Sequence, residues 1–344
     1  MTNEHILIRK SPPLDGTAHL TGAKNAVLTI MASLVLTNGR SILTNVPDSA
    51  DVRQMIKLLT NLGAVVDFHP KENRIIIDTK TINHFEVSPE IMNKMRASIL
   101  VMGPLLARFS RARVALPGGC LIGARPIDFH LKGFAKMGAT IKQDGQFLDA
   151  TLTSSQSFFN RVILEYPSVG ATENIMMCAA LTPGTTTIVN AAFEPEVLDL
   201  IAVLKKMGAS IECGPGLIIS VTGVTALQPI EYSIIPDRLE AGALLLATAL
   251  TGGRLHIPNG QPETMDIFLE KLSQMGHTIT TNNGITLTAT NHPHAITIKT
   301  APYPGFPTDL QAPMMAALTL ADGVSEVEET VFENRLIHVQ ELKK

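Results

Sequence analysis

The chain has 344 residues, of which 45% are hydrophobic and 17% charged, and its formal net charge is −3. Such a composition belongs to a folded, core-rich protein and excludes intrinsic disorder. The small charge, the 4% aromatic content and the absence of Trp argue against a nucleic-acid partner. No apolar run approaches the roughly 18 to 20 residues that span a bilayer, and the first residues do not form a secretory signal. No membrane partner and a cytoplasmic location are therefore expected.

The elements predicted along the chain repeat with a period near 70 residues. Four helical patterns end in a glycine that leads into a strand pattern, at Gly63, Gly138, Gly208 and Gly276, which are 75, 70 and 68 residues apart. Glycine at this position favours the left-handed conformation that ends a helix. The helix that ends at each glycine is amphipathic and is expected on an outer face.

A second kind of helix precedes each of these glycines by roughly 40 residues. It is rich in Ala, Leu and Met and is expected to be buried, because it is apolar on nearly all faces. Its copies begin at Gly22, Arg96, Gly170 and Arg238, and a fifth copy begins at Thr308. The sequence therefore predicts an α/β fold of pseudo-symmetric units, with the fifth unit stopping at Lys344 where its glycine turn is due.

Cations open three of these apolar helices, at Lys24, Arg96 and Arg238. The positive end of a helix disfavours a cation, so each needs a nearby anion. Arg238 has Asp237 and Glu240 beside it, whereas Lys24 has no acid close in sequence. Two interpretations are open: the helix ends bind an anionic ligand, or each cation forms a structural salt bridge across the repeat.

The segment 115–126 is rich in Gly and Pro and contains Cys120. Arg113 and Arg125 lie close in sequence, and such an electropositive setting lowers the pKa of a thiol. Cys120 is therefore a candidate proton donor, base or nucleophile, with a small buried hydrophobe as the alternative. The odd count of three cysteines without C-x-x-C spacing disfavours a disulfide framework and structural zinc.

Two further sites have two interpretations each. Asp309, at the start of the fifth buried helix, is either a helix-capping acid or a general base. Ser168-Val169-Gly170 is either a helix cap or a phosphate cradle. The usual nucleotide and metalloprotease motifs are absent, and His292-Pro293-His294 is only a weak metal candidate, so no metal is expected.

Six motifs resemble the UDP-N-acetylglucosamine 1-carboxyvinyltransferases, in order and over essentially the whole chain. They are Gly22-Ala23-Lys24-Asn25-Ala26, Met95-Arg96-Ala97-Ser98, the run from Leu116 to Asp128, Pro167-Ser168-Val169-Gly170-Ala171-Thr172, Phe306-Pro307-Thr308-Asp309-Leu310-Gln311 and Thr330-Val331-Phe332-Glu333-Asn334-Arg335. The resemblance implies an inside-out α/β barrel fold, similar to EPSP synthase, with two domains of three units each. It also implies transfer of the enolpyruvyl group of phosphoenolpyruvate to the 3-hydroxyl of UDP-N-acetylglucosamine. This is the first committed step of peptidoglycan synthesis, and with it come roles in cell wall biogenesis, cell shape and cell division.

The resemblance also implies a role for individual residues, without a metal or organic cofactor. Phosphoenolpyruvate binds Lys24, Asn25, Arg125 and Cys120, and the catalytic residues are Lys24, Cys120 as general acid and Asp309 as base. UDP-N-acetylglucosamine binds a larger set, which comprises Arg96, Arg125, Pro126, Ile127, Asp128, Phe129, Ser168, Val169, Gly170, Asp309 and Val331.

The predicted domains are residues 22–234, and residues 1–21 together with 235–344. Six units of this period need roughly 420 residues, so the second domain is expected to lack the end of unit five and all of unit six. The N-terminal strand near Ile6 to Ile8 is expected to lose its neighbours there. The alternative to an active transferase is a non-catalytic remnant that binds a UDP-sugar. A third possibility, the sister enzyme that acts on phosphorylated shikimate, is disfavoured by Cys120 and Ser168-Val169-Gly170.

Overall fold

The computed structural model describes Leu7 and residues 9–116, 127–153 and 159–343. These residues form two compact units: residues 21–237, called here the large unit, and residues 1–20 with 238–344, called the small unit. Each unit has its own hydrophobic core, one around Val27, Leu105 and Met176 and the other around Leu245, Phe268 and Met314. Among the described residues, no helix is both long and apolar enough to cross a bilayer.

Three four-stranded sheets form the outside of the large unit, in the orders β13-β2-β4-β3, β5-β6-β8-β7 and β9-β10-β12-β11. In each sheet the first two strands are parallel and the later pairs are antiparallel. The strands are β2 (Arg40–Thr44), β3 (Val65–His69), β4 (Arg74–Asp78), β5 (Glu86–Val87), β6 (Arg111–Ala115), β7 (Ala139–Asp144), β8 (Phe147–Leu152), β9 (Phe159–Ile163), β10 (Thr185–Val189), β11 (Ser210–Gly214), β12 (Ile218–Thr222) and β13 (Glu231–Ser233). Because β13 comes from the far end of the unit and pairs with β2, the three repeats close on one another.

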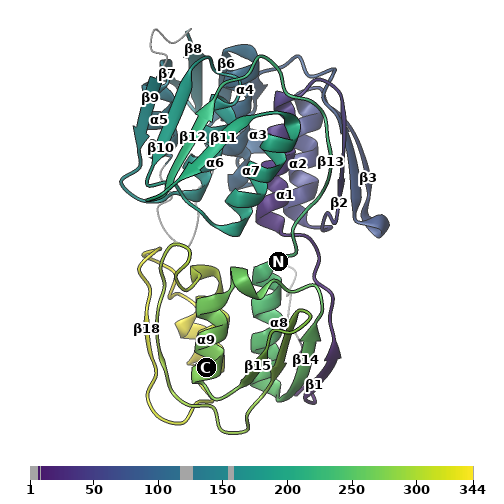
Figure 1. Cartoon of the computed structure of the whole chain (residues 1–344), viewed down its shortest axis with the longest axis vertical. Helices are drawn as coiled ribbons and strands as arrows, with labels where there is room; N and C mark the ends of the chain where they lie inside the picture. Colours follow the sequence, from purple (N-terminus) through teal and green to yellow (C-terminus); the bar gives the residue numbers. More distant parts are fainter. Residues whose placement is uncertain (1–6, 8, 117–126, 154–158, 344) are drawn as a thin grey trace, which may run out of the picture. The chain divides into compact units, whose positions relative to one another are not determined.

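Buried helices fill the centre of the large unit, which is the inside-out arrangement that the family resemblance implied (Figure 1). They are α1 (Lys24–Ser33), α4 (Met102–Phe109) with the 3-10 helix η3 (Arg96–Val101) before it, and α6 (Val169–Ala179). The amphipathic helices are α2 (Ala50–Asn61), α5 (Asp128–Lys136) and α7 (Pro195–Met207), and the short ones are η1 (Leu34–Leu36), η2 (Pro70–Glu72) and α3 (Pro89–Met92).

The second buried helix differs from the expectation, because its first six residues form η3 and not α-helix. Pro104 has no N–H, so the carbonyl of Leu100 has no α-helical donor four residues later. Ser98 also bonds to the carbonyl of Met95, through its N–H at 3.2 Å and its hydroxyl at 2.5 Å. This three-residue spacing favours the tighter helix.

The glycine turns are confirmed at all four predicted positions. Gly63, Gly138, Gly208 and Gly276 have φ angles of 105°, 96°, 107° and 92°. Each follows one of the amphipathic helices and leads into a strand within three residues, as the repeat predicted.

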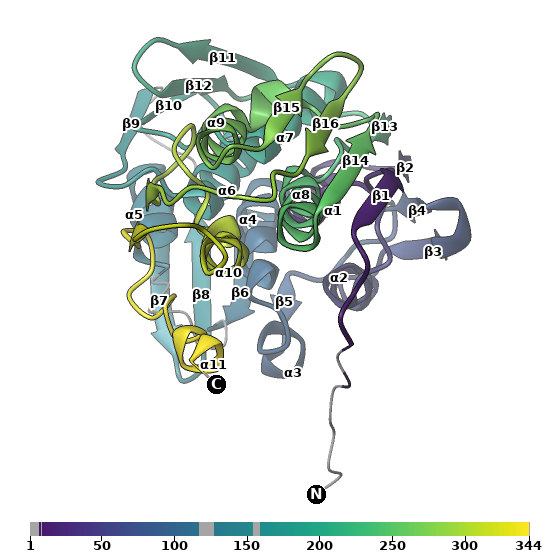
Figure 2. The ribbon, with the colours of Figure 1, turned by 90° about the horizontal axis from the view of Figure 1, so that it is seen from below.

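The small unit repeats the same sheet pattern once, in the order β1-β14-β16-β15 (Figure 2). A strand that was not predicted, β1 (Leu14–Thr17), pairs along its whole length with β14 (Gly253–Ile257). A side chain at Gly253 would overlap the Leu14 carbonyl oxygen, so glycine permits this close pairing. Ile6 and Ile8 lie outside the described residues.

The remaining elements of the small unit follow α8 (Arg238–Thr251), its long central helix. They are η4 (Pro262–Thr264), α9 (Asp266–Gln274), β15 (Thr278–Thr280), β16 (Ile285–Thr288), β17 (Thr297–Lys299), η5 (Thr308–Leu310), α10 (Gln311–Leu318), β18 (Glu326–Glu328) and α11 (Val339–Leu342). Strands β17 and β18 pair in parallel, and α8 and α10 pack together as the two buried helices of this unit.

Candidate active site

Lys24 is the first residue of α1, a helix with no side-chain cap and no acid in its first turn. Its Nζ lies 2.9 Å from Oδ2 of Asp51, and its backbone N–H donates to Oδ2 of Asp237 at 3.1 Å. The salt-bridge interpretation is therefore confirmed for Lys24, with a partner 27 residues away that sequence spacing missed. The Lys24 and Asp51 side chains are 45% and 37% exposed, and such a pair contributes only about 0 to 1 kcal/mol to stability. The stability gained from this ion pair therefore gives little reason for a cation at the start of α1.

Ser168 caps α6, since its Oγ accepts from the N–H of Ala171 at 3.4 Å. This confirms the cap interpretation and leaves the other first-turn N–H groups, which belong to Val169 and Gly170, directed out of the helix end. The N-terminus of an α-helix in this form suits an anion.

Helix α5 begins at Asp128, with Ile127 as its N-cap residue. The Asp128 carboxylate pairs with Lys132 at 3.1 Å through Oδ2, while its Oδ1 is buried without a hydrogen-bond partner among the described residues. Nζ of Lys132 also lies 5.4 Å from the centroid of the Phe129 ring. A buried carboxylate oxygen without a partner is costly in a folded protein, so it marks this helix start as a candidate binding position.

Two buried side chains that sequence reasoning missed join these segments. Asn174 of α6 donates to Nδ1 of His130, at 3.0 Å, and to the carbonyl of Ile99, at 2.9 Å. His130 follows Phe129, and Ile99 lies in the 3-10 helix that begins at Arg96. The signal in the sequence is the polar run Thr172-Glu173-Asn174 inside an otherwise apolar helix.

In the small unit, Asp309 lies in η5 and accepts from Nη2 of Arg335 at 2.6 Å. Its side chain is 48% exposed, whereas that of Arg335 is 16% exposed. Asp309 was expected as a cap or a base. It makes an ion pair with a residue of the sixth motif, which brings two of the resemblance motifs together.

Glu329 holds the Val331 turn against the same helix. One of its carboxylate oxygens accepts from the N–H groups of Val331 and Phe332, at 2.8 and 3.1 Å, and the other accepts from the Thr308 hydroxyl at 3.0 Å. Glu329 was not predicted as a site residue from the sequence.

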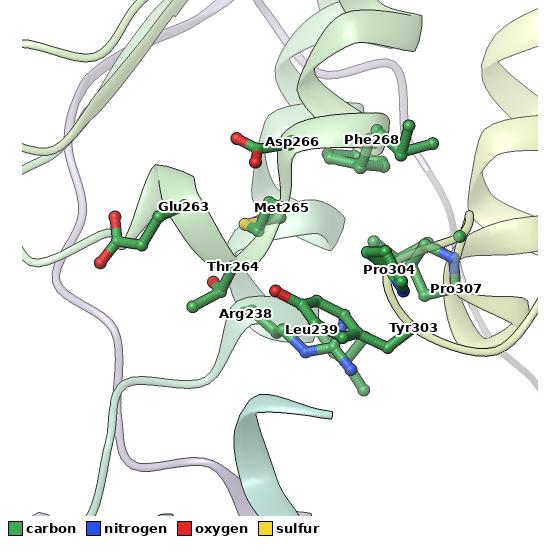
Figure 3. Close-up of a pocket in the computed structure, with 13 residues that line it drawn as sticks. Arg238, Leu239, Glu263, Thr264, Met265, Asp266, Phe268, Tyr303, Pro304 and Pro307 are labelled. Atoms are coloured by element: carbon green, nitrogen blue, oxygen red, sulfur yellow. The ribbon is translucent and has the colours of Figure 1, made fainter. Parts of the chain in front are cut away.

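Arg238, the third cation, opens α8 and lines a small pocket with Glu263, Tyr303 and Pro307 (Figure 3). Its guanidinium lies 5.6 Å from the centroid of the Tyr303 ring. Aromatic stacking, which the sequence did not suggest, thus accounts for part of its environment.

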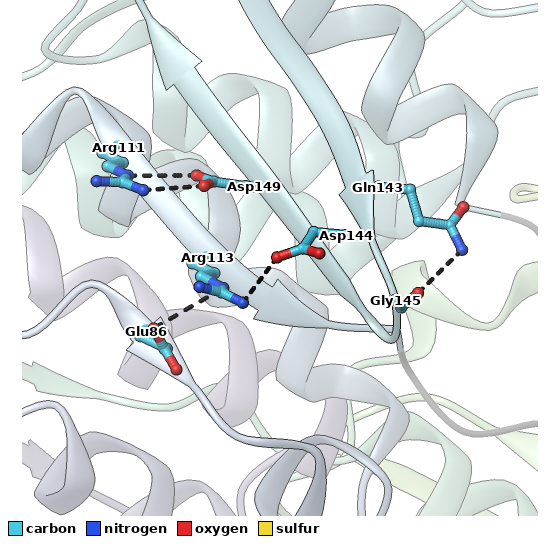
Figure 4. A network of polar contacts seen from close by, with 7 residues as sticks. All are labelled: Glu86, Arg111, Arg113, Gln143, Asp144, Gly145 and Asp149. Carbon is cyan, nitrogen blue, oxygen red and sulfur yellow. Dashed lines mark hydrogen bonds and ion pairs between the residues drawn. The ribbon is translucent and has the colours of Figure 1, made fainter.

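Arg113 was expected to influence Cys120, but its charge is paired on the sheet of β5, β6, β8 and β7 (Figure 4). Its guanidinium lies 3.1 Å from Asp144 and 3.9 Å from Glu86, and it covers the Phe147 ring at 4.5 Å. Two acids that the sequence analysis did not connect with Arg113 therefore share its charge. Cys120, Arg125 and Pro126 lie outside the described residues.

The weak metal candidate is not supported by the described residues, among which no group of three or more His, Cys, Asp or Glu side chains could hold a metal ion. The backbone N–H of His294 donates to the carbonyl of Met275 at 2.9 Å, which ties this segment to the end of α9.

The buried helices inside outer sheets, with cations and caps at the helix starts, define an EPSP synthase-like α/β protein. The family model described as EPSP synthase (3-phosphoshikimate 1-carboxyvinyltransferase) matches residues 8–344, and the chain belongs to this family of carboxyvinyl transferases. Two solved structures share the fold. The enolpyruvyl transferase NikO from Streptomyces tendae has a TM-score of 0.86 and 20% identity, over 98% of this chain and 80% of that chain. EPSP synthase from Acinetobacter baumannii has a TM-score of 0.69 and 17% identity, over 92% of this chain and 75% of that chain.

Two curated relatives are closer in sequence. The chain is 45% identical to UDP-N-acetylglucosamine 1-carboxyvinyltransferase 1 of Caldanaerobacter subterraneus, over 98% of this chain and 81% of the relative. It is 46% identical to UDP-N-acetylglucosamine 1-carboxyvinyltransferase of Desulfosudis oleivorans, over 99% and 81%. The resemblance stated from the motifs is confirmed.

Proposed function

We propose that the chain transfers the enolpyruvyl group of phosphoenolpyruvate to the 3-hydroxyl of UDP-N-acetylglucosamine and releases phosphate. The observation that carries this proposal is the 45–46% identity, across nearly the whole chain, to two proteins named for this transfer. The proposal also assigns the reaction to the start of peptidoglycan synthesis in the cytoplasm, and so to cell division.

The reaction has two steps whose atoms balance. In the first step the sugar hydroxyl adds to C2 of phosphoenolpyruvate, the methylene carbon gains a proton, and the hydroxyl proton goes to a base. In the second step the methyl carbon loses a proton and the phosphate leaves, which restores the double bond as an enol ether. The chemistry needs an acid at the methylene carbon, a base at the hydroxyl and cations for the phosphate.

In the proposed assignment, Lys24, Asn25 and Arg125 hold phosphoenolpyruvate, and Cys120 delivers the proton to its methylene carbon. The Lys24 ammonium at the start of α1 supports a role with an anion, because the ion pair with Asp51 leaves it nearly half exposed. Asp309 accepts the proton of the sugar hydroxyl. Its exposed carboxylate, oriented by Arg335, supports that role.

The nucleotide is assigned to the helix starts. Arg96, Ser168, Val169 and Gly170 face the diphosphate in this proposal, and the free first-turn N–H groups of α6 support it. The remaining proposed nucleotide residues are Arg125, Pro126, Ile127, Asp128, Phe129, Asp309 and Val331.

Phosphate release with both substrates tests the proposal. Wild type should turn over, and Cys120→Ala should slow turnover by about 10²- to 10⁴-fold, the usual contribution of a general acid. Cys213→Ala, the same change at an exposed cysteine of β11, should keep the wild-type rate. Replacing UDP-N-acetylglucosamine by phosphorylated shikimate should give no turnover. No phosphate release at high enzyme, with UDP-N-acetylglucosamine binding intact by calorimetry, would instead favour the binding-only alternative.

A further inference from the structure

The start of α1 lies beside the segment at which the chain leaves the large unit, residues 234–237, called here the exit segment. Gly22 and Pro236 form an isolated antiparallel bridge. The N–H of Asp237 donates to the carbonyl of Thr21 at 2.9 Å. The segments at which the chain enters and leaves this unit are therefore bonded to each other next to the first residue of α1.

The exit segment is held on both sides. The side chain of Asn45 donates to the carbonyl of Ile234 at 2.9 Å, and the N–H of Ala23 donates to the carbonyl of Ile235 at 2.8 Å. A Cβ built on Gly22 would stand 1.8 Å from the carbonyl oxygen of Asn45, so this close approach needs glycine. The exit segment is thus a fixed support for the residues that precede α1.

Asp237, the last residue of the exit segment, caps α1 from a distance. Ala23 is the N-cap residue of α1 and has no side-chain acceptor, while Oδ2 of Asp237 accepts from the N–H of Lys24 at 3.1 Å. The two residues are 213 positions apart, and the sequence connected Asp237 only with its neighbour Arg238. A carboxylate also suits the positive end of a helix.

The cap acts on the residue that carries the ammonium group. Helix ends fray, and Lys24 is the first residue of α1, so loss of its N–H acceptor affects Lys24 before any other residue of the helix. An ammonium group has three N–H donors. Among the described residues, Asp51 accepts from one of them at 2.9 Å, which leaves two for a ligand. The place of these two donors depends on where the backbone of Lys24 is held.

We propose that Asp237 is a positioning residue for Lys24, whose carboxylate holds the first residue of α1 so that the ammonium group meets phosphoenolpyruvate in a fixed place. The inference rests on the proposed function, in which Lys24 binds this substrate, and it adds a residue that acts through the Lys24 backbone. It requires no contact between Asp237 and either substrate.

Three variants of the full chain separate this role from a general loss of stability. Asp237→Ala removes the acceptor, whereas Asp237→Asn keeps an oxygen that caps a helix equally well. Asp78→Ala is the matched control, because Oδ1 of Asp78 accepts from the N–H of Lys80 at 2.9 Å at the end of β4, a contact of the same kind. Phosphate release is measured with each substrate varied in turn while the other is saturating.

Asp237→Ala should raise the KM for phosphoenolpyruvate about fivefold, the factor that corresponds to a lost helix cap, and leave the KM for UDP-N-acetylglucosamine within about twofold. Asp237→Asn and Asp78→Ala should keep both KM values within about twofold of wild type. An equal rise in both KM values, no rise in Asp237→Ala, or the same rise in Asp237→Asn would overturn the proposal.

Two further measurements cover the other outcomes. If Asp237→Ala does not fold, Asp237→Glu, which keeps the charge but moves the carboxylate by one methylene, should show the same rise for phosphoenolpyruvate alone, and an unchanged KM would overturn the proposal. No phosphate release from wild type would refute the proposed function itself. Hydrogen exchange at the Lys24 amide does not depend on turnover; it should be faster in Asp237→Ala than in wild type and Asp237→Asn, and equal rates would overturn the positioning role.

Discussion

Replacement of Glu173 by Gln should change how the stability of the chain depends on pH. Glu173 lies in α6 with 3% of its surface exposed. Burial raises the pKa of its carboxyl from 4.5 to about 8, a hydrogen bond with Thr29 partly offsets this, and the nearby Glu196 and Glu194 add to it. The group is therefore neutral in the folded chain at neutral pH.

The size of the effect follows from proton linkage. Below pH 4.5 the carboxyl is protonated in both states and costs nothing. As the pH rises towards 8, only the unfolded chain loses the proton, so the free energy of unfolding falls by up to about 1.4 kcal/mol per pH unit. The full interval of 8 minus 4.5, or 3.5 units, corresponds to about 5 kcal/mol as an upper bound. Glutamine has nearly the same shape and does not titrate, so Glu173→Gln should not show this loss.

Urea unfolding followed by circular dichroism, at several pH values between about 5 and 8.5, measures the effect. The difference in stability between Glu173→Gln and wild type should move in favour of the variant by several kcal/mol across this range. Glu212→Gln, which makes the same change at an exposed position of β11, should give a pH-independent difference. A difference for Glu173→Gln that stays constant with pH would refute the reasoning.

Three other changes have expected outcomes. Ser168→Ala and Ser49→Ala each remove a helix cap, and each should lower the free energy of unfolding by about 1 kcal/mol. Only Ser168→Ala should also weaken UDP-N-acetylglucosamine binding in calorimetry. Equal binding in both variants would contradict the nucleotide role of Ser168. Gly208→Ala should destabilise the folded chain by about 1 to 2 kcal/mol. The cause is backbone strain alone, because φ at Gly208 is 107° and no atom lies within 4 Å of the new Cβ. An unchanged midpoint of denaturation would contradict this. Asp309→Asn should lower turnover in the phosphate-release assay, because the amide cannot accept the hydroxyl proton, whereas Asp322→Asn, the same change at an exposed site, should leave turnover unchanged.

The sequence alone determined the repeat and the kind of element in each part of it. Gly63, Gly138, Gly208 and Gly276 end helices because their left-handed backbone is a local property, which the residue type decides. The Ala- and Leu-rich composition of the stretches after Lys24 and Arg238 likewise determined that these helices are buried. The motifs, read in order, also determined the family.

Only the tertiary structure decided which of these residues meet. Lys24 pairs with Asp51, Asn174 with His130 and Asp309 with Arg335, across separations of 27, 44 and 26 residues. Periodicity gives the face of a helix on which a residue lies, but these pairs depend on which helices pack together and on how they are rotated against one another. The buried His130 ring shows the same limit, because burial lowers its pKa to about 4 and the residues next to it in the sequence do not indicate that burial.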